Sequence, residues 1–450
     1  MKELTKYRRG SLRELWAVAW PLVVSSAANM FMLVGDRIVL THYSTDTFNA
    51  CLGAMPWIWT AYFPLLTIVN IANVLVGRFN GSGEYWQIGP TVWQMLWFSV
   101  ALLIPLGIGG WFLAPHLLER SFRELGTPYL RVLFPNVAVA LAAFGALAAF
   151  YTGRGKTRFV LAVSVASNML NVFLDIVLVF GIGPFPEMGI VGSAVGTVIA
   201  TAVALSLFFV HFLSRENSAK FCTRDLRGNG HLFGTCLRVG TPNGFAAFIN
   251  FALWSWIAQV MAHFVPAENF TAFGVSQSAL YCMLFFIEGV SFGVGTIVSN
   301  AYGANDWDVV ARNSRAWLKL SAIVFAGSFL LMVAYPRPLL AIICSGSMSE
   351  SFYNILWTML LLSWVAIATE CVTFNLRQTL TAFGDTRFTM WVNIVFYSGI
   401  VVFPSYVLLR RTHSAAAFLA AEAVSNVAML LLYSIRFRRW LRLRPAPPTD

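Results

Sequence analysis

Long apolar runs, separated by short polar or Gly/Pro-containing breaks, fill almost the whole chain. Each run reaches the roughly twenty residues that a helix needs to cross the hydrocarbon core of a bilayer. The pattern therefore predicts an all-α polytopic membrane protein. Twelve transmembrane helices are expected, at residues 13–41, 47–79, 87–114, 128–153, 156–182, 188–213, 233–264, 269–302, 308–345, 350–383, 386–409 and 414–437.

Composition agrees with this pattern. The 450 residues are 58% hydrophobic and only 11% charged, whereas a soluble chain of that length must cover a large surface with charge. The net charge of +11 would suggest nucleic acid in a soluble protein. Here the basic residues lie in short loops between apolar runs and form no long face that could follow a phosphate backbone. No nucleic-acid partner is expected.

The distribution of Lys and Arg predicts the orientation, because cytoplasmic loops carry an excess of both. With both termini inside, 24 of the 31 basic residues fall on the inner side and 7 on the outer side. The first residues, MKELTKYRRGSLRELW, have no cleavage pattern after a short apolar core. They are interpreted as a cytoplasmic amphipathic lead-in to the first span, not as a signal peptide.

The longest hydrophilic interruption lies halfway along the chain and divides the spans into two sets of six. It predicts an N-terminal six-helix lobe at 1–213, a cytoplasmic linker at 214–232, a C-terminal six-helix lobe at 233–440 and a cytoplasmic tail at 441–450.

Short motifs recur between the two halves. GKTRF at 155–159 returns as GDTRF at 384–388, and Pro21 of the first span returns as Pro242 of the seventh. Because each half holds six spans, both halves start on the same side of the membrane. The repeat is therefore parallel, with a pseudo-twofold axis along the membrane normal. Such repeats are typical of secondary transporters, which bind substrate between the halves.

Carboxylates within apolar spans are costly and mark functional sites. In the fifth span, Asn168, Asn171 and Asp175 share one helix face. Asp36 of the first span lies at a similar depth from the outer end, given the rise of a helix. Two facing carboxylates with an amide nearby could hold a proton or a sodium ion. The alternative is that Asp36 pairs with its neighbour Arg37 near the outer interface.

The sequence lacks the residue patterns of disulfide, metal, phosphate-loop and nucleophilic chemistry. The six cysteines have no CxxC spacing, so neither a disulfide framework nor a zinc site is expected. Gly155-Lys156-Thr157 resembles the end of a phosphate loop, but the leading glycine would have to be residue 150, which is Phe. The histidines lie at predicted span ends, without metal or nucleophile spacing. No cofactor is expected, and the chain is not expected to be an enzyme.

The run GRGKTRF…NMLNVFLDIVLVFG…PEMGIVGSAVGT, together with AFGDTRF in the second half, resembles the multidrug and toxic compound extrusion (MATE) family. The resemblance covers essentially the whole chain in length, span number and duplication. It implies a secondary active antiporter that couples inward movement of a proton or sodium ion to export of organic, often cationic, drug-like compounds by alternating access.

The resemblance also implies a site in the first half. One prokaryotic branch has a first-span Asp, a fifth-span Asn and Asp four residues apart, and a sixth-span Thr around a cavity. Those positions match Asp36, Asn171, Asp175 and Thr197. Proton or, alternatively, sodium binding is expected at the first three. Pro21 matches the kinking proline of the first helix and is the expected hinge.

A second cation site is implied in the other half. Glu370 lies fifteen residues before Asp385, the spacing at which another branch carries a cation-binding acid in its tenth span. That branch has a glutamate where this chain has Asn250, and Glu288 near the middle of span eight is the substitute considered. Glu422 in span twelve is a further membrane carboxylate, for which a packing role and a functional role are equally expected.

Two other function classes are alternatives. A lipid-linked saccharide flippase of the same superfamily would have extra spans or a cationic central cavity, whereas basic residues are nearly absent from mid-span here. An intramembrane acyltransferase-type enzyme would need a His or Ser beside an acid at the membrane surface. The expected partners are small organic substrates and membrane lipids, the expected state is a monomer, and the expected location is the bacterial cytoplasmic (inner) membrane.

Overall fold

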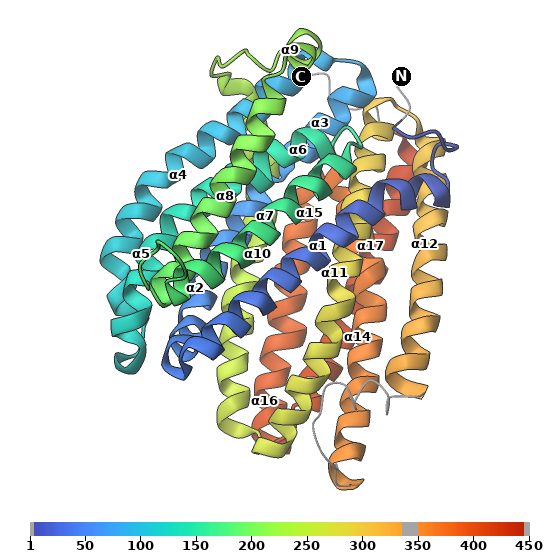
Figure 1. Cartoon of the computed structure of the whole chain (residues 1–450). Helices are drawn as coiled ribbons and strands as arrows, with labels where there is room; N and C mark the ends of the chain where they lie inside the picture. The colour runs from blue at the N-terminus through green and yellow to red at the C-terminus, as the bar shows by residue number, and fades with distance from the viewer. Residues whose placement is uncertain (1–3, 335–349, 445–450) are drawn as a thin grey trace. The chain divides into compact units, whose positions relative to one another are not determined.

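The computed structural model describes residues 4–334 and 350–444, and within these ranges every regular element is a helix (Figure 1). Twelve helices in the described residues are long and apolar enough to cross a membrane. The twelve predicted spans and the all-α class are thereby confirmed. The later part of the predicted span 308–345, the end of the predicted tail 441–450 and Arg337 lie outside the described residues.

The chain forms two compact units. Unit 1 contains residues 1–4 and 20–244, and unit 2 contains residues 5–19 and 245–450. Two helices, α1 (Leu12–Tyr43) and α10 (Gly230–Phe264), contribute to both units. The division falls after Ala19 in α1 and after Gly244 in α10, in each case two residues from the repeated proline, Pro21 or Pro242.

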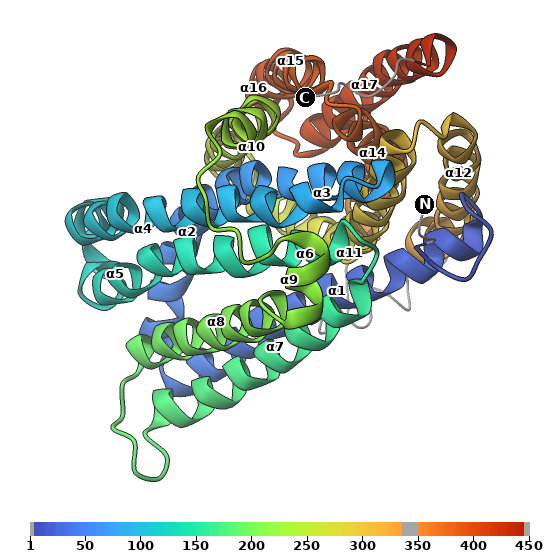
Figure 2. The ribbon, with the colours of Figure 1, turned by 90° about the horizontal axis from the view of Figure 1, so that it is seen from above.

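Unit 1 contains the helices of the fifth and sixth spans, which lie side by side in both ribbon views (Figures 1 and 2). Its elements are α2 (Thr45–Val69), α3 (Ile71–Ser82), η1 (Tyr85–Gln87), α4 (Ile88–Leu117), η2 (Arg120–Phe122), α5 (Arg123–Ala140), the π-helical η3 (Leu141–Leu147), α6 (Ala148–Thr152), α7 (Thr157–Phe180), α8 (Ile190–Phe212) and α9 (Arg215–Phe221).

Unit 2 follows the same principle of long apolar helices joined by short turns. Its elements are α11 (Ala267–Gly303), α12 (Trp307–Phe329), the π-helical η4 (Leu330–Ala334), α14 (Glu350–Ala382), α15 (Thr386–Phe396), the π-helical η5 (Tyr397–Val402), α16 (Phe403–Thr412) and α17 (Ala416–Leu443).

The repeated sequence motif forms the same turn twice. Gly155 and Gly384 both adopt left-handed backbone, with φ of 71° and 81°, which glycine reaches without steric penalty. The next residue closes each turn through its amide, from Lys156 to the Tyr151 carbonyl at 2.8 Å and from Asp385 to the Leu380 carbonyl at 3.0 Å. The matching geometry supports the duplication inferred from the sequence.

The side chains of the two turns differ in their partners. In unit 1, the Arg154 guanidinium lies over the rings of Phe150 and Phe221, 3.6 and 4.2 Å from their centroids. Burial lowers the pKa of Arg154 to about 10, so the group remains charged at neutral pH. In unit 2, Asp385 accepts hydrogen bonds from Arg436 at 2.6 and 3.2 Å and from the Trp440 indole at 2.9 Å.

Replacing Asp385 with Asn is expected to lower the thermal stability of the protein. The Asp385 carboxylate is only 11% exposed and accepts three hydrogen bonds. An asparagine in its place would be uncharged, and a hydrogen bond to a charged group contributes about 1.5–3 kcal/mol. The melting temperature in detergent measures this effect. The control is Asp308→Asn, because the Asp308–Arg444 ion pair is 3.7 Å long and exposed and such a pair contributes little to stability. Equal melting temperatures for the two variants would contradict the expectation.

The linker between the two sets of spans is fixed to α4. The indole of Trp93 donates to the carbonyl of Thr223 at 2.8 Å, and the indole of Trp97 donates to that of Leu226 at 3.3 Å. Gln94 accepts from the amide of Asn229 at 3.2 Å. The predicted linker at 214–232 therefore includes the short helix α9 and a segment held along unit 1. The domain boundaries themselves stay a prediction.

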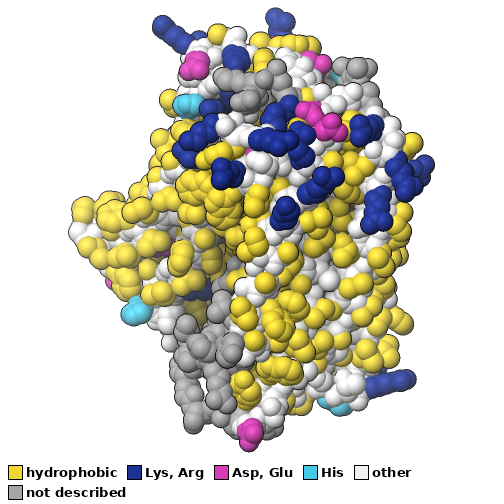
Figure 3. Space-filling view, turned by 90° about the vertical axis from the view of Figure 1, so that its right-hand side faces the viewer, with side chains coloured by type: hydrophobic (Ala, Val, Ile, Leu, Met, Phe, Trp, Pro, Cys, Tyr) yellow, Lys and Arg dark blue, Asp and Glu magenta, His cyan; other side chains and the backbone are white. Residues whose placement is uncertain are grey.

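Polar and apolar side chains are segregated on the surface. On the face drawn in Figure 3, hydrophobic side chains cover the middle, and Lys and Arg side chains gather toward the upper end. Many large hydrophobic side chains are exposed along the spans, including Ile104, Phe112, Met169 and Val210. An exposed apolar surface of this extent requires a lipid environment. The protein is integral to a membrane.

Candidate ion-coupling site

The loop between α7 and α8 sets the geometry of a buried carboxyl site in unit 1. Helix α7 ends at Gly181, whose left-handed backbone (φ 65°) turns the chain back. The amides of Met188 and Gly189 then bond to the carbonyls of Leu178 and Val179 at 3.0 and 3.3 Å. Helix α8 therefore starts directly beside the end of α7.

A glycine allows the two helices to approach closely. A Cβ atom built on Gly192 would lie 2.6 Å from the carbonyl oxygen of Leu178, a distance that no side chain tolerates. This close approach brings Ser193 and Gly196 of α8 against Asp175.

The structure brings all four predicted first-half residues together. The carboxyl groups of Asp36 on α1 and Asp175 on α7 lie within hydrogen-bonding reach of each other. The Asn171 amide, oriented so that both of its ends are satisfied, donates to Asp36 Oδ1 at 3.1 Å and accepts from Thr197 N and Oγ1 at 3.3 and 3.2 Å. Ser193 Oγ donates to Asp175 Oδ2 at 3.3 Å.

Burial decides the chemistry of this pair. Asp175 is fully buried and Asp36 nearly so. Arg37 is exposed, and no ion pair joins it to Asp36 among the salt bridges of the described residues. Since carboxylates only accept hydrogen bonds, a bond between two carboxyl groups requires a proton on one of them. Two buried carboxyl groups so placed are suited to bind one proton between them.

The oxygen donors of this site bear on metal binding. Within residues 4–334 and 350–444, no group of three or more His, Cys, Asp or Glu side chains is close enough to hold a metal ion. Asp36 and Asp175 offer two carboxyl groups, and Asn171 and Thr197 add an amide and a hydroxyl. Such oxygen donors suit a hard cation as well as a proton, so sodium stays the alternative.

Two contributors were not singled out from the sequence. Ser193 bonds directly to Asp175, and a Cβ atom on Gly196 would lie 2.7 Å from Asp175 Oδ1. The sequence spacing could have identified both residues, because residues 193 and 196 share one face of α8 with the predicted site residue Thr197.

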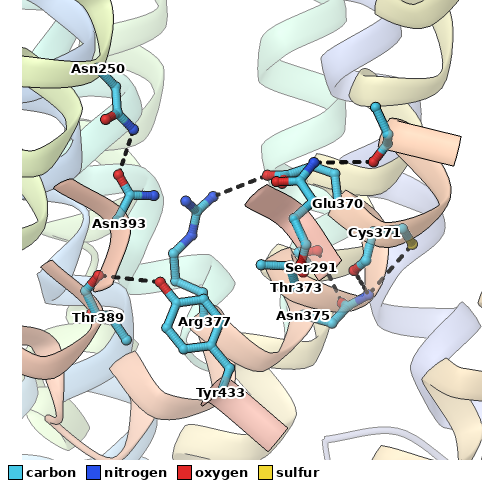
Figure 4. A network of polar contacts seen from close by, with 12 residues as sticks. Asn250, Ser291, Glu370, Cys371, Thr373, Asn375, Arg377, Thr389, Asn393 and Tyr433 are labelled. Carbon is cyan, nitrogen blue, oxygen red and sulfur yellow. Dashed lines mark hydrogen bonds and ion pairs between the residues drawn. The ribbon is translucent and has the colours of Figure 1, made fainter. Parts of the chain in front are cut away.

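The predicted second-half residues do not form one cluster. Asn250 Nδ2 donates to Asn393 Oδ1 at 2.6 Å. Glu370 forms an ion pair with Arg377, 3.8 Å from Nη2 to Oε1 (Figure 4). Glu288 is half-buried on α11, and among the described residues no hydrogen bond or ion pair joins it to Glu370 or Asn250.

Arg377 is the residue of this region that the sequence analysis missed. It was counted among the basic residues of the inner ends, whereas the structure directs its guanidinium toward Glu370 inside unit 2. The available signal was the spacing, because residues seven apart return to the same helix face. Glu370 is thus already matched with a cation from its own helix.

Comparison with known proteins identifies the class and then the family. The twelve apolar helices define a polytopic helical membrane protein. A sequence profile of the MatE family matches residues 21–177 and 245–407, more than half of the chain. The chain belongs to the MatE family, in agreement with the resemblance drawn from its motifs.

Individual relatives agree with this assignment. The chain is 24% identical to YoeA of Bacillus subtilis, named a probable multidrug resistance protein, over 92% of this chain and 90% of that protein. It is 24% identical to NorM of Acinetobacter baylyi, which carries the same description, over 96% of each. A solved outward-facing multidrug resistance MATE family transporter has the same fold, with a TM-score of 0.84, 14% identity and 96% coverage of both chains.

Proposed function

We propose that the protein is a secondary active antiporter that couples inward movement of a proton to export of organic, often cationic, drug-like compounds by alternating access. The observation that carries the proposal is the buried Asp36–Asp175 carboxyl pair within the spans of a MatE family chain. The names of the relatives supply the substrate class. Sodium is the alternative coupling ion.

Coupling requires the ion to bind one conformation more tightly than another. The carboxyl pair is held by groups on three helices, α1, α7 and α8. Rearrangement of α1 would separate Asp36 from Asp175 and change the affinity of the pair for its proton. A proton taken up from outside would then favour the conformation that releases substrate.

Pro21 is the hinge in this proposal. Proline removes one hydrogen bond of the helix ladder and weakens the helix at that point. The division between the two units falls two residues before it, after Ala19. On the unit 2 side, the segment before the hinge is anchored by an ion pair between Arg9 and Asp306 at 2.9 Å. Bending at Pro21 would therefore move Asp36 without detaching the start of the chain.

The remaining expectations follow from the same proposal. Substrates and lipids are the expected partners, no cofactor other than the coupling ion is needed, and a monomer is sufficient because Asp36 and Asp175 lie in one chain. The location is a bacterial cytoplasmic membrane with both termini inside. The flippase alternative is not favoured, since the named relatives are multidrug resistance proteins. An acyltransferase-type enzyme has no observation in its favour.

Dye efflux from proteoliposomes tests the proposal. Purified protein is reconstituted with an accumulated organic cation, and a proton gradient and then a sodium gradient are imposed separately. Efflux that accelerates with the proton gradient alone is the expected result. Acceleration by the sodium gradient alone would show that sodium, and not the proton, is the coupling ion. Efflux that responds to neither gradient would overturn the antiporter proposal.

A further inference from the structure

The guanidinium of Arg377 is incompletely satisfied in the described part of unit 2. Its polar contact is the 3.8 Å ion pair with Glu370, and its other contact is the face of the Phe374 ring, 4.3 Å from the centroid. The ion pair is longer than a hydrogen bond. An arginine carries five N–H donors in a planar fork. Among the described residues, the pair with Glu370 leaves part of this planar fork without a protein acceptor.

Unpartnered acceptors lie in the same region. Asn250 Oδ1 and Glu422 Oε2 are buried side-chain oxygens without a hydrogen-bond partner among the described residues. Glu422 interacts electrostatically with Glu370. Figure 4 shows the Arg377 guanidinium between Asn393, the partner of Asn250, and Glu370. The Arg377 guanidinium therefore lies between the Asn250–Asn393 pair and Glu370.

The Arg377–Glu370 pair is partly exposed. The side chains of Arg377 and Glu370 are 25% and 24% exposed. Charged side chains within membrane spans face the bundle interior or a water-filled path, since exposure to lipid is too costly. The free donors of Arg377 therefore point to a polar ligand, and their planar fork suits a carboxylate.

We propose that Arg377 is a selectivity-determining residue of the C-terminal lobe, which binds organic compounds that carry both a carboxylate and a cationic group. The carboxylate bonds to the Arg377 fork, and the cationic group faces Glu370 and Glu422. The fixed positive charge disfavours simple cations, and the two glutamates disfavour simple anions. The inference rests on the proposed function, in that it specifies which of the exported organic compounds this lobe recognises.

A matched pair of dyes tests the assignment. Rhodamine 110 has a free carboxylate, and rhodamine 123 is its methyl ester, so the two differ only in that group. Fluorescence polarisation with the purified protein gives a dissociation constant for each, without any ion gradient. The parent is expected to bind rhodamine 110 more tightly than rhodamine 123. Arg377→Gln is expected to shift the ratio of the two dissociation constants toward rhodamine 123 by roughly tenfold or more, because one charge-assisted hydrogen bond is lost.

Two variants control for structural effects. Arg387→Gln makes the same charge change at an exposed position of the same unit and should keep the parent ratio. Glu370→Gln with Arg377→Gln removes both charges, so that no buried charge is left unpaired, and should lose the preference as Arg377→Gln does. A parent ratio retained in both Arg377 variants would overturn the proposal.

The outcome separates this inference from the proposed function. If both dyes bind and the ratio is insensitive to Arg377, the selectivity assignment is wrong and the antiporter proposal stands. If the parent binds neither dye, the assignment fails, and gradient-driven efflux of other organic cations decides the antiporter proposal independently.

Discussion

Asp175→Asn is expected to reduce ion-driven export to the passive leak while leaving expression unchanged. Asparagine keeps the size of the side chain and can still accept from Ser193, so the packing of α7 against α8 should persist. It cannot carry the proton shared with Asp36. Efflux from everted vesicles or proteoliposomes under a proton gradient measures the loss.

Asp46→Asn is the matched control for this variant. Asp46 lies in the first turn of α2, in the same unit, and is exposed, so its replacement should leave export unchanged. Glu370→Gln tests the second half separately, and there efflux should still respond to the gradient because Glu370 already has Arg377 as its partner. Undiminished gradient-driven export by Asp175→Asn would refute the proposed coupling site.

Gly196→Ala is expected to slow ion-driven export by about tenfold or more, the effect of roughly 1.4 kcal/mol or more on a rate. The added methyl group would lie 2.7 Å from Asp175 Oδ1, well inside van der Waals contact, so the carboxyl group or α8 must shift. A displaced Asp175 can no longer meet both Asp36 and Ser193. Transport rates at matched protein amounts measure this effect.

The control for this variant is Gly107→Ala in α4, where a Cβ atom would meet nothing within 4 Å. Alanine also favours a helix over glycine, so that variant should be at least as stable as the parent. If Gly196→Ala transported as rapidly as Gly107→Ala, Gly196 would have no part in positioning the carboxyl pair.

Much of the fold follows from the sequence because a membrane imposes simple rules. A spanning helix must be apolar over about twenty residues, so twelve runs give twelve helices. The duplication could be read from two glycine turns, since glycine adopts a left-handed backbone without steric penalty. The depth of Asp36 and Asp175 follows from the constant rise of a helix.

Contacts between side chains on neighbouring helices are harder to predict from the sequence. The rotation of each helix about its own axis depends on packing against its neighbours, and the sequence of one helix does not determine it. Arg377 therefore looked like one more basic residue near an inner end, whereas it contacts Glu370. Gly196 looked like a packing residue, and its proximity to Asp175 appears only when α7 and α8 are placed together.

The function of the carboxyl pair rests on its shared proton, which can be counted directly. Isothermal titration of tetraphenylphosphonium into purified protein, in sodium-free buffers of different ionisation enthalpy, gives the number of protons released on binding. If substrate and proton favour different conformations, their binding is reciprocally linked. The account predicts release of about one proton per ligand by the parent and none by Asp175→Asn. Binding by the parent without proton release, or equal release by both proteins, would contradict it.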